Sequence, residues 1–99
     1  MSKREKDKEH ELISEIINLY LEDSIKESQL YLKLLDNQVK LYQERLQFLK
    51  MDKPFFFQKK KIGIYNQNIE DCEQKIKETY LKIGEELAEI QKNKQIINL

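Results

Sequence analysis

The sequence predicts an all-α protein, an antiparallel two-helix hairpin that is coiled-coil-like and completes a bundle with a second chain. Charged residues make up 36% of the 99 residues, against about 25% in an ordinary globular domain. Two Gly and one Pro leave the chain few turn signals. Over most of the length, apolar residues recur at alternating steps of four and three, which is the repeat of a coiled coil.

The first eleven residues alternate basic and acidic side chains and contain no apolar segment. We expect residues 1–11 to form a charged, flexible N-terminus ahead of a single helical-hairpin domain at residues 12–99. A segment without an apolar stretch is not a secretory signal, and one cysteine cannot form an internal disulfide framework. These two observations favour a cytoplasmic protein.

The first helix is expected at residues 12–50, because a heptad repeat runs from Leu21 onward. With Ile25 at heptad position a, the repeat continues through Ser28, Leu32, Leu35, Val39, Tyr42, Leu46 and Leu49. Before Leu21 the apolar pattern is also helical, but it is shifted in register. A second apolar stripe, at heptad positions c and g, consists of Tyr31, Leu34, Leu41 and Phe48. So wide an apolar arc indicates burial against at least two other helices.

Pro54, the only proline, marks the break between the helices. It disfavours helix at Lys53 and is tolerated in the first turn of a new helix, which Asp52 is suited to cap. The two predicted helices are nearly equal in length and the break is short, which favours an antiparallel hairpin. A continuous rod kinked at Pro54 is the alternative.

The second helix is expected at residues 54–97, where every seventh residue is apolar. These residues, at heptad position a, are Phe55, Ile62, Ile69, Ile76, Ile83, Ile90 and Ile97. The paired d positions begin with Tyr65 and Cys72 but end in Glu86 and Asn93, while the neighbouring e positions become apolar at Tyr80 and Leu87. Because a straight helix drifts by about 20° per heptad, we expect the buried stripe to move from d to e.

Two helices alone enclose little core, and small chains are marginal unless they bury apolar surface elsewhere. We therefore expect either a homodimer or a complex with a protein partner that has exposed helices. The predicted self-assembly seam consists of Leu32, Leu35, Val39, Leu46, Leu49, Ile62, Ile69, Ile76, Ile83 and Ile90.

The predicted partner-binding surface is apolar and lies off this seam. It consists of Leu34, Leu41, Phe48, Phe56 and Phe57. An apolar surface outside the contact between the two helices is typical of a helix that packs on a further partner.

A basic tip adjoins the two phenylalanines and consists of Lys53, Lys59, Lys60 and Lys61. Aromatic residues beside lysines are suited to anchor in a protein groove, to rest on an anionic membrane or to stack on bases. In the alternative interpretation, Phe56 and Phe57 fold back and close the end of the hairpin. A net charge of zero disfavours nucleic acid. The chain also lacks an apolar run of the roughly 18 residues that span a membrane.

No catalytic or cofactor-binding constellation emerges from the sequence, so we expect a non-enzyme without metal or cofactor. Cys72 and His10 cannot complete a zinc site, and two glycines cannot make a phosphate-binding loop. The acidic group of Glu70, Asp71 and Glu73 is interpreted as a solvated helix face. No nucleophile–base pair can be assembled.

A Gly-poor helical hairpin over Leu12 to Ile97 with a mid-chain break resembles the small helical-hairpin partners of LXG toxins in bacterial type VII secretion. Such a resemblance implies a chain that binds the N-terminal helices of a toxin. The turn departs from the WXG type, because Lys53-Pro54-Phe55-Phe56 stands there and the chain has no Trp. The aromatic-x-x-x-acid export signal is also missing near the C-terminus, where no aromatic follows Tyr80. The resemblance therefore implies a partner or targeting factor that carries no export signal itself.

The sequence thus favours a non-enzymatic protein–protein interaction module, such as an adaptor, a targeting chaperone or a small subunit. It would act by packing helical faces against a partner protein. The alternative is a small helical nucleic-acid-associated or phage/host regulatory protein that uses the basic Phe/Lys tip.

Overall fold

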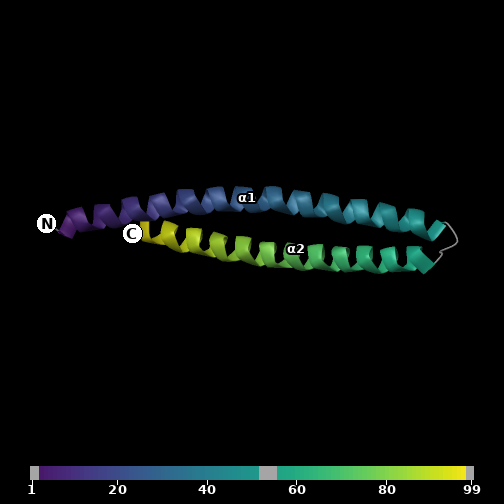
Figure 1. Ribbon diagram of the computed structural model, residues 1–99. Helices are drawn as coiled ribbons and strands as arrows, with labels where there is room; N and C mark the ends of the chain where they lie inside the picture. The colour runs from purple at the N-terminus through teal and green to yellow at the C-terminus, as the bar shows by residue number, and fades with distance from the viewer. Residues whose placement is uncertain (1–2, 52–55, 98–99) are drawn as a thin grey trace. The chain divides into compact units, whose positions relative to one another are not determined.

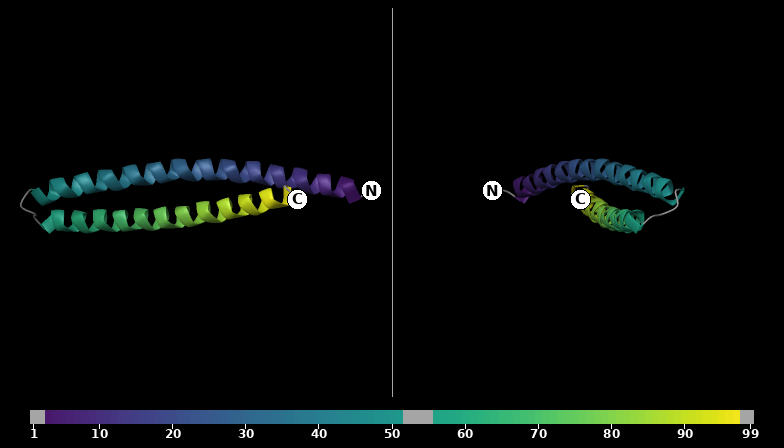
Figure 2. Two further views of the ribbon diagram at one scale, coloured as in Figure 1. Left: turned by 180° about the vertical axis from the view of Figure 1, so that it is seen from behind. Right: turned by 45° about the vertical axis from the view of Figure 1, so that its right-hand side comes forward.

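The computed structural model describes the backbone of residues 3–51 and 56–97 and the side chains of residues 8–51 and 59–95. These residues form two α-helices, α1 (Lys3–Met51) and α2 (Phe56–Ile97), and no strand occurs among them (Figure 1). Two further views show that neither helix is interrupted along its described length (Figure 2). The prediction of an all-α helical hairpin is confirmed.

The helix boundaries lie close to the expected ones except at the N-terminus. Helix α1 begins at Lys3, nine residues before the expected start, and continues through the charged segment. Lys, Arg and Glu are good helix formers, and opposite charges three residues apart, as in Glu5 and Lys8, support a helix. Helix α2 begins two residues later than expected. Pro54 and Asp52 lie outside the described residues.

The chain divides into two compact units. Unit 1 combines the described parts of Met1–Gln29 and Tyr80–Leu99, and unit 2 is formed by the described parts of Leu30–Thr79. In each unit a segment of α1 packs antiparallel against a segment of α2. Hydrogen bonds join Asn93 to Asn18 in unit 1 and Cys72 to Gln38 in unit 2, pairs that a continuous rod would hold far apart. The kinked-rod alternative is therefore wrong.

Unit 1 buries a small apolar cluster and several polar residues. Leu21, Ile25 and Ile90 form the cluster, and Ile83 packs against it. The buried polar side chains of this unit belong to Ser14, Asn18, Ser28 and Glu86. The helix–helix contact in unit 1 is therefore mixed in character.

Unit 2 buries mainly apolar side chains. Its buried apolar residues are Leu32, Leu35, Leu46 and Cys72, and its buried polar residue is Thr79. The rings of Tyr42 and Tyr65, from α1 and α2, lie with their centroids 5.8 Å apart at an interplanar angle of 34°. Aromatic pairs favour such tilted or offset arrangements.

A heptad spacing relates the buried and half-buried positions along both helices, apart from the half-buried Ser24 and Asn68. On α1 the spacing continues toward the N-terminus through Asn18 and Ser14, so the expected shift of register before Leu21 is wrong. On α2 the d positions Thr79 and Glu86 are buried, so the expected move of the buried stripe to position e is also wrong. The e-position side chains are largely exposed, with exposed fractions of 61% for Tyr80 and 53% for Leu87. Helices under-wound to 3.5 residues per turn keep positions a and d facing the partner helix, which removes the drift.

Candidate protein-binding surface

The ten residues of the predicted self-assembly seam lie on the covered sides of their helices. Four are buried, namely Leu32, Leu35, Leu46 and Ile90. Six are half-buried, namely Val39, Leu49, Ile62, Ile69, Ile76 and Ile83. Within each unit these residues contribute to the contact of α1 with α2. Whether the same residues also drive assembly between chains stays a prediction.

The predicted partner-binding residues on α1 are well exposed in unit 2. The exposed fraction of their side chains is 62% for Leu34, 53% for Leu41 and 76% for Phe48. Because they recur every seventh residue, they form one stripe along α1, and Leu30 and Tyr31 are exposed beside it. We call these five residues the unit 2 face. The side chains of Phe56 and Phe57 lie outside the described part of the chain.

Basic side chains flank the unit 2 face. Lys33 and Lys40 each precede a leucine of the stripe, and Arg45 lies one turn from both Leu41 and Phe48. Of the predicted basic tip, Lys59, Lys60 and Lys61 are exposed on the first turns of α2, whereas Lys53 falls outside the described residues.

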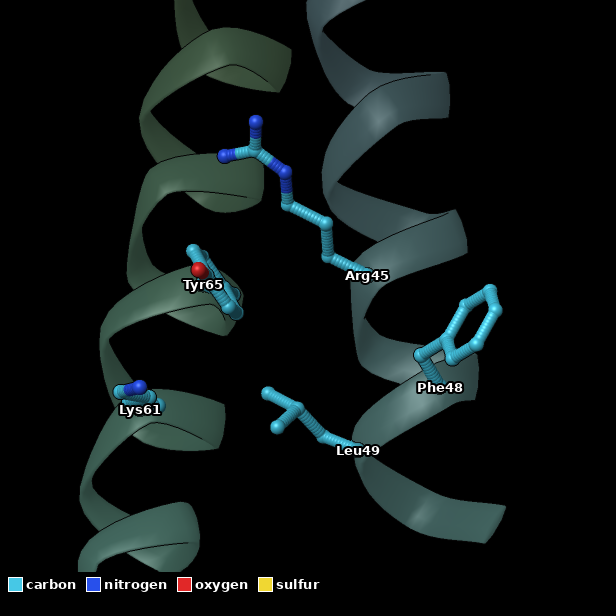
Figure 3. A pocket seen from close by; sticks show the side chains of 5 residues that line it. All are labelled: Arg45, Phe48, Leu49, Lys61 and Tyr65. Carbon is cyan, nitrogen blue, oxygen red and sulfur yellow. The ribbon is translucent and has the colours of Figure 1, made fainter.

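An open pocket of about 300 Å³ adjoins the unit 2 face, between α1 and α2. It is lined by Arg45, Phe48, Leu49, Lys61 and Tyr65 (Figure 3). Leu49 points from α1 toward α2, whereas Phe48 points away from α2 (Figure 3). The lining combines two cationic groups with aromatic and aliphatic surface. This chemistry is suited to an apolar partner side chain that has a carboxylate beside it.

A second exposed apolar surface lies in unit 1, at residues that were not predicted to bind a partner. On α1 the surface comprises Leu12, Ile13, Ile16, Ile17, Leu19 and Tyr20, with exposed fractions from 40% to 74%. We call these six residues the unit 1 face. Its signal was available in the sequence, because extending the heptad backward from Ile25 assigns Asn18 and Ser14 to the seam. All six apolar residues then fall at outward positions.

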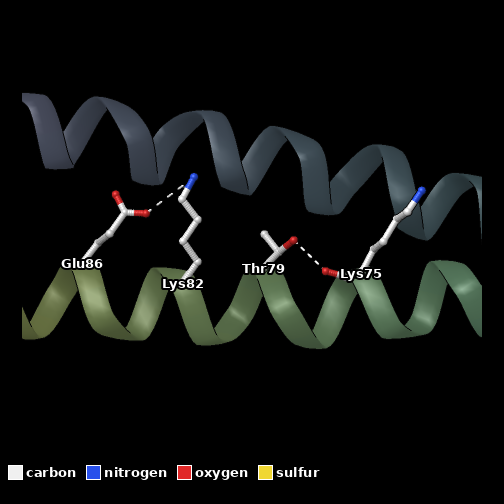
Figure 4. Close-up of polar contacts among 4 residues, drawn as sticks. All are labelled: Lys75, Thr79, Lys82 and Glu86. Atoms are coloured by element: carbon white, nitrogen blue, oxygen red, sulfur yellow. Dashed lines mark hydrogen bonds and ion pairs between the residues drawn. The ribbon is translucent and has the colours of Figure 1, made fainter.

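The polar seam of unit 1 is only partly satisfied by hydrogen bonds. The Asn93 side-chain amide donates to Asn18 Oδ1 over 2.9 Å, which links α2 to α1. Glu86 Oε1 is buried and accepts no hydrogen bond among the described residues. Lys82 Nζ lies 3.9 Å from that oxygen, close enough for an ion pair but too far for a hydrogen bond (Figure 4). Lys82 is itself 60% exposed, so this pair offsets little of the cost of burying the carboxylate.

Polar groups in unit 2 are better satisfied. Thr79 Oγ1 donates to the backbone carbonyl of Lys75 over 2.7 Å (Figure 4). The thiol of Cys72 donates to Gln38 Oε1 over 3.6 Å, from α2 to α1. Both groups are therefore compatible with their places in a largely apolar contact.

Among residues 8–51 and 59–95, no three His, Cys, Asp or Glu side chains gather where a metal ion would bind. Neither helix contains, in its described portion, a stretch with the length and apolar character needed to cross a membrane.

Comparison of the chain with protein-family models, with curated proteins and with solved structures finds no match. The resemblance to partners of LXG toxins therefore stays a prediction.

Proposed function

We propose that this chain is a cytoplasmic, non-enzymatic protein–protein interaction module that packs exposed helical faces against the helices of a partner protein. Adaptor, targeting chaperone and small subunit are the roles that this activity would serve. A partner of an LXG toxin is one member of this class.

One observation carries the proposal: more apolar side chains are exposed than buried. Among the described residues, sixteen large apolar side chains are at least 40% exposed, whereas seven apolar residues are buried. Contiguous exposed apolar patches on a protein mark interaction sites. The exposed residues of α1 recur at helical spacing, so they offer continuous stripes to another helix.

Leu41→Glu tests this proposal, because a carboxylate at the centre of the unit 2 face would have to be buried in the complex. Tagged chain is purified from its native host at moderate salt, and a stoichiometric partner is identified by mass spectrometry. We expect the variant to lose at least about tenfold in affinity for that partner. Its helix content by circular dichroism stays nearly unchanged, because Leu41 is already 53% exposed.

Gln43→Glu is the matched control, since it adds the same charge at an exposed position on the other side of α1. It is expected to retain the affinity of the original chain. Equal partner binding by Leu41→Glu and Gln43→Glu would show that the unit 2 face is not the binding surface.

A second candidate function is nucleic-acid association, supported by the three exposed lysines Lys59, Lys60 and Lys61. Binding of this kind weakens steeply as salt increases, because each lysine–phosphate contact releases counterions. Binding to single-stranded RNA or DNA that is unchanged between low and moderate salt would count against this candidate.

A further inference from the structure

We infer that a second copy of this chain covers both exposed faces, with the unit 1 face of one copy packed against the unit 2 face of the other. The inference rests on the proposed function and names the helices that the faces would bind. The contact is reciprocal, so a two-fold dimer makes it twice.

The unit 1 face has a largely acidic border. Ile13, Ile16, Ile17 and Tyr20 have the spacing of one side of a helix. The charged residues at the heptad positions that surround them are three acids and one base: Glu9, Asp23, Glu27 and Lys26. All four are exposed. The face therefore presents an apolar centre within a negative field.

The unit 2 face has the opposite border. At the same heptad positions on this part of α1, the charged residues are three bases and one acid: Lys33, Lys40, Arg45 and Glu44. All of these are also exposed. Lys61 on α2 adds another cation at the adjoining pocket.

The two borders carry opposite charges, so unlike borders of two copies attract each other and like borders repel. Pairing unit 1 with unit 1 would bring acids against acids, and pairing unit 2 with unit 2 would bring bases against bases. Pairing unit 1 with unit 2 matches opposite charges at both contacts, which favours this arrangement and suppresses the others. Apolar centres with polar rims are also the usual anatomy of protein interfaces.

The pocket in unit 2 gives this contact a point of attachment. Its aromatic and aliphatic lining lies beside the cationic groups of Arg45 and Lys61. The unit 1 face offers the matching combination, because Tyr20 lies one helical turn from Asp23. A tyrosine with an acid beside it satisfies both parts of the lining.

The area available is sufficient for a stable dimer. The chain has an accessible surface of 8446 Å². A specific interface of standard size needs only about 800 Å² from each partner.

Two charge-swap variants of the full chain test the inference. The first variant, Lys33→Glu with Lys40→Glu and Arg45→Glu, makes both borders acidic. The second variant, Glu9→Lys with Asp23→Lys and Glu27→Lys, makes both borders basic. Sedimentation velocity over about 1 to 200 µM measures the dissociation constant of the dimer.

We expect the original chain to dimerise and each variant alone to weaken the dimer by about tenfold or more. An equimolar mixture of the two variants is expected to form a one-to-one heterodimer, which also shows that both variants fold. Glu15→Lys with Glu22→Lys is the control, because these exposed residues lie at position e, away from the face. The control variant dimerises like the original chain.

Three results would overturn the inference. They are an original chain that stays monomeric, a dimer unaffected by either charge swap, and two helical variants that fail to pair when mixed. A monomeric chain that still binds another protein through Leu41 would overturn the inference of a dimer but would leave the proposed function standing. A monomeric chain without any Leu41-dependent partner overturns both.

Discussion

Unit 1 and unit 2 follow the same heptad repeat but bury different kinds of side chain. Unit 2 buries four apolar residues and Thr79, whereas unit 1 buries Leu21, Ile25 and Ile90 with four polar residues. In unit 1 the apolar residues that would normally fill a seam lie on the outside of α1. The difference indicates that unit 2 supplies most of the stability of the hairpin, while unit 1 gives up stability for specific alignment and exposed surface.

The alignment in unit 1 depends on the contact between Asn18 and Asn93. A slip of one heptad would set Asn93 against Ile25 and leave both amides without their partner. Polar residues at seam positions fix register at some expense of stability. Glu86, seven residues before Asn93, falls in the layer of Ile25 by the same spacing.

The largest expected effect is a loss of stability when the apolar seam of unit 2 is truncated. Leu35 is only 3% exposed, the lowest value among the buried apolar residues. Truncation of a buried leucine to alanine lowers the free energy of unfolding by about 2–5 kcal/mol. For Leu35→Ala we expect a loss in the upper part of this range, and for Leu21→Ala, in the mixed seam of unit 1, a loss at its lower end. Urea denaturation measures both, and equal losses would remove the energetic distinction between the units.

A gain in stability is expected when the buried carboxylate of unit 1 is replaced. Glu86→Leu removes a buried oxygen that lacks a hydrogen bond and adds apolar surface near Ile83 and Ile90. The free energy of unfolding is expected to rise by about 1–3 kcal/mol.

Glu85→Leu is the control for that substitution, because Glu85 is the exposed neighbour on the same helix. It is expected to change stability by less than about 0.5 kcal/mol. A loss of stability in Glu86→Leu would mean that the carboxylate is satisfied in the folded protein, and the polar seam of unit 1 would need another explanation.

The smallest expected effect concerns the two helical glycines, one in each unit. A Cβ added at Gly63 or at Gly84 would meet nothing within 4 Å. Gly63→Ala and Gly84→Ala are each expected to stabilise the chain by about 0.5–1 kcal/mol, because alanine restricts the unfolded chain. Thermal unfolding at low protein concentration measures both. A destabilised Gly84→Ala variant would indicate that another helix approaches unit 1 at this position.

The sequence was sufficient to predict the two helices, their antiparallel contact and most of the seam in unit 2. Leu32, Leu35 and Leu46 satisfy the heptad with apolar side chains, so the repeat is easily recognised there. Leu34, Leu41 and Phe48 were assigned to an outer stripe for the same reason, and all three are exposed.

The sequence was less informative about unit 1, because hydrophobicity and burial diverge in that unit. Ile16 and Ile17 are more apolar than Asn18, yet Asn18 is buried and Ile16 is 64% exposed. The heptad extended backward from Ile25 marks Asn18 and Ser14 as seam positions, whereas the hydrophobicity of the residues alone indicates the opposite side of α1. The early start of α1 was missed for a related reason, since alternating charges are compatible with both a helix and a disordered segment.

Cys72 is a built-in probe for the opening of unit 2. It is the only cysteine in the sequence, it is buried, and its thiol donates to Gln38 on the opposite helix. A thiol-specific reagent is expected to react with it much faster when α1 and α2 separate in this unit, because exposure of the thiolate controls reactivity. The alkylation rate of Cys72 therefore reports how often the two helices separate in unit 2, and no engineered label is needed.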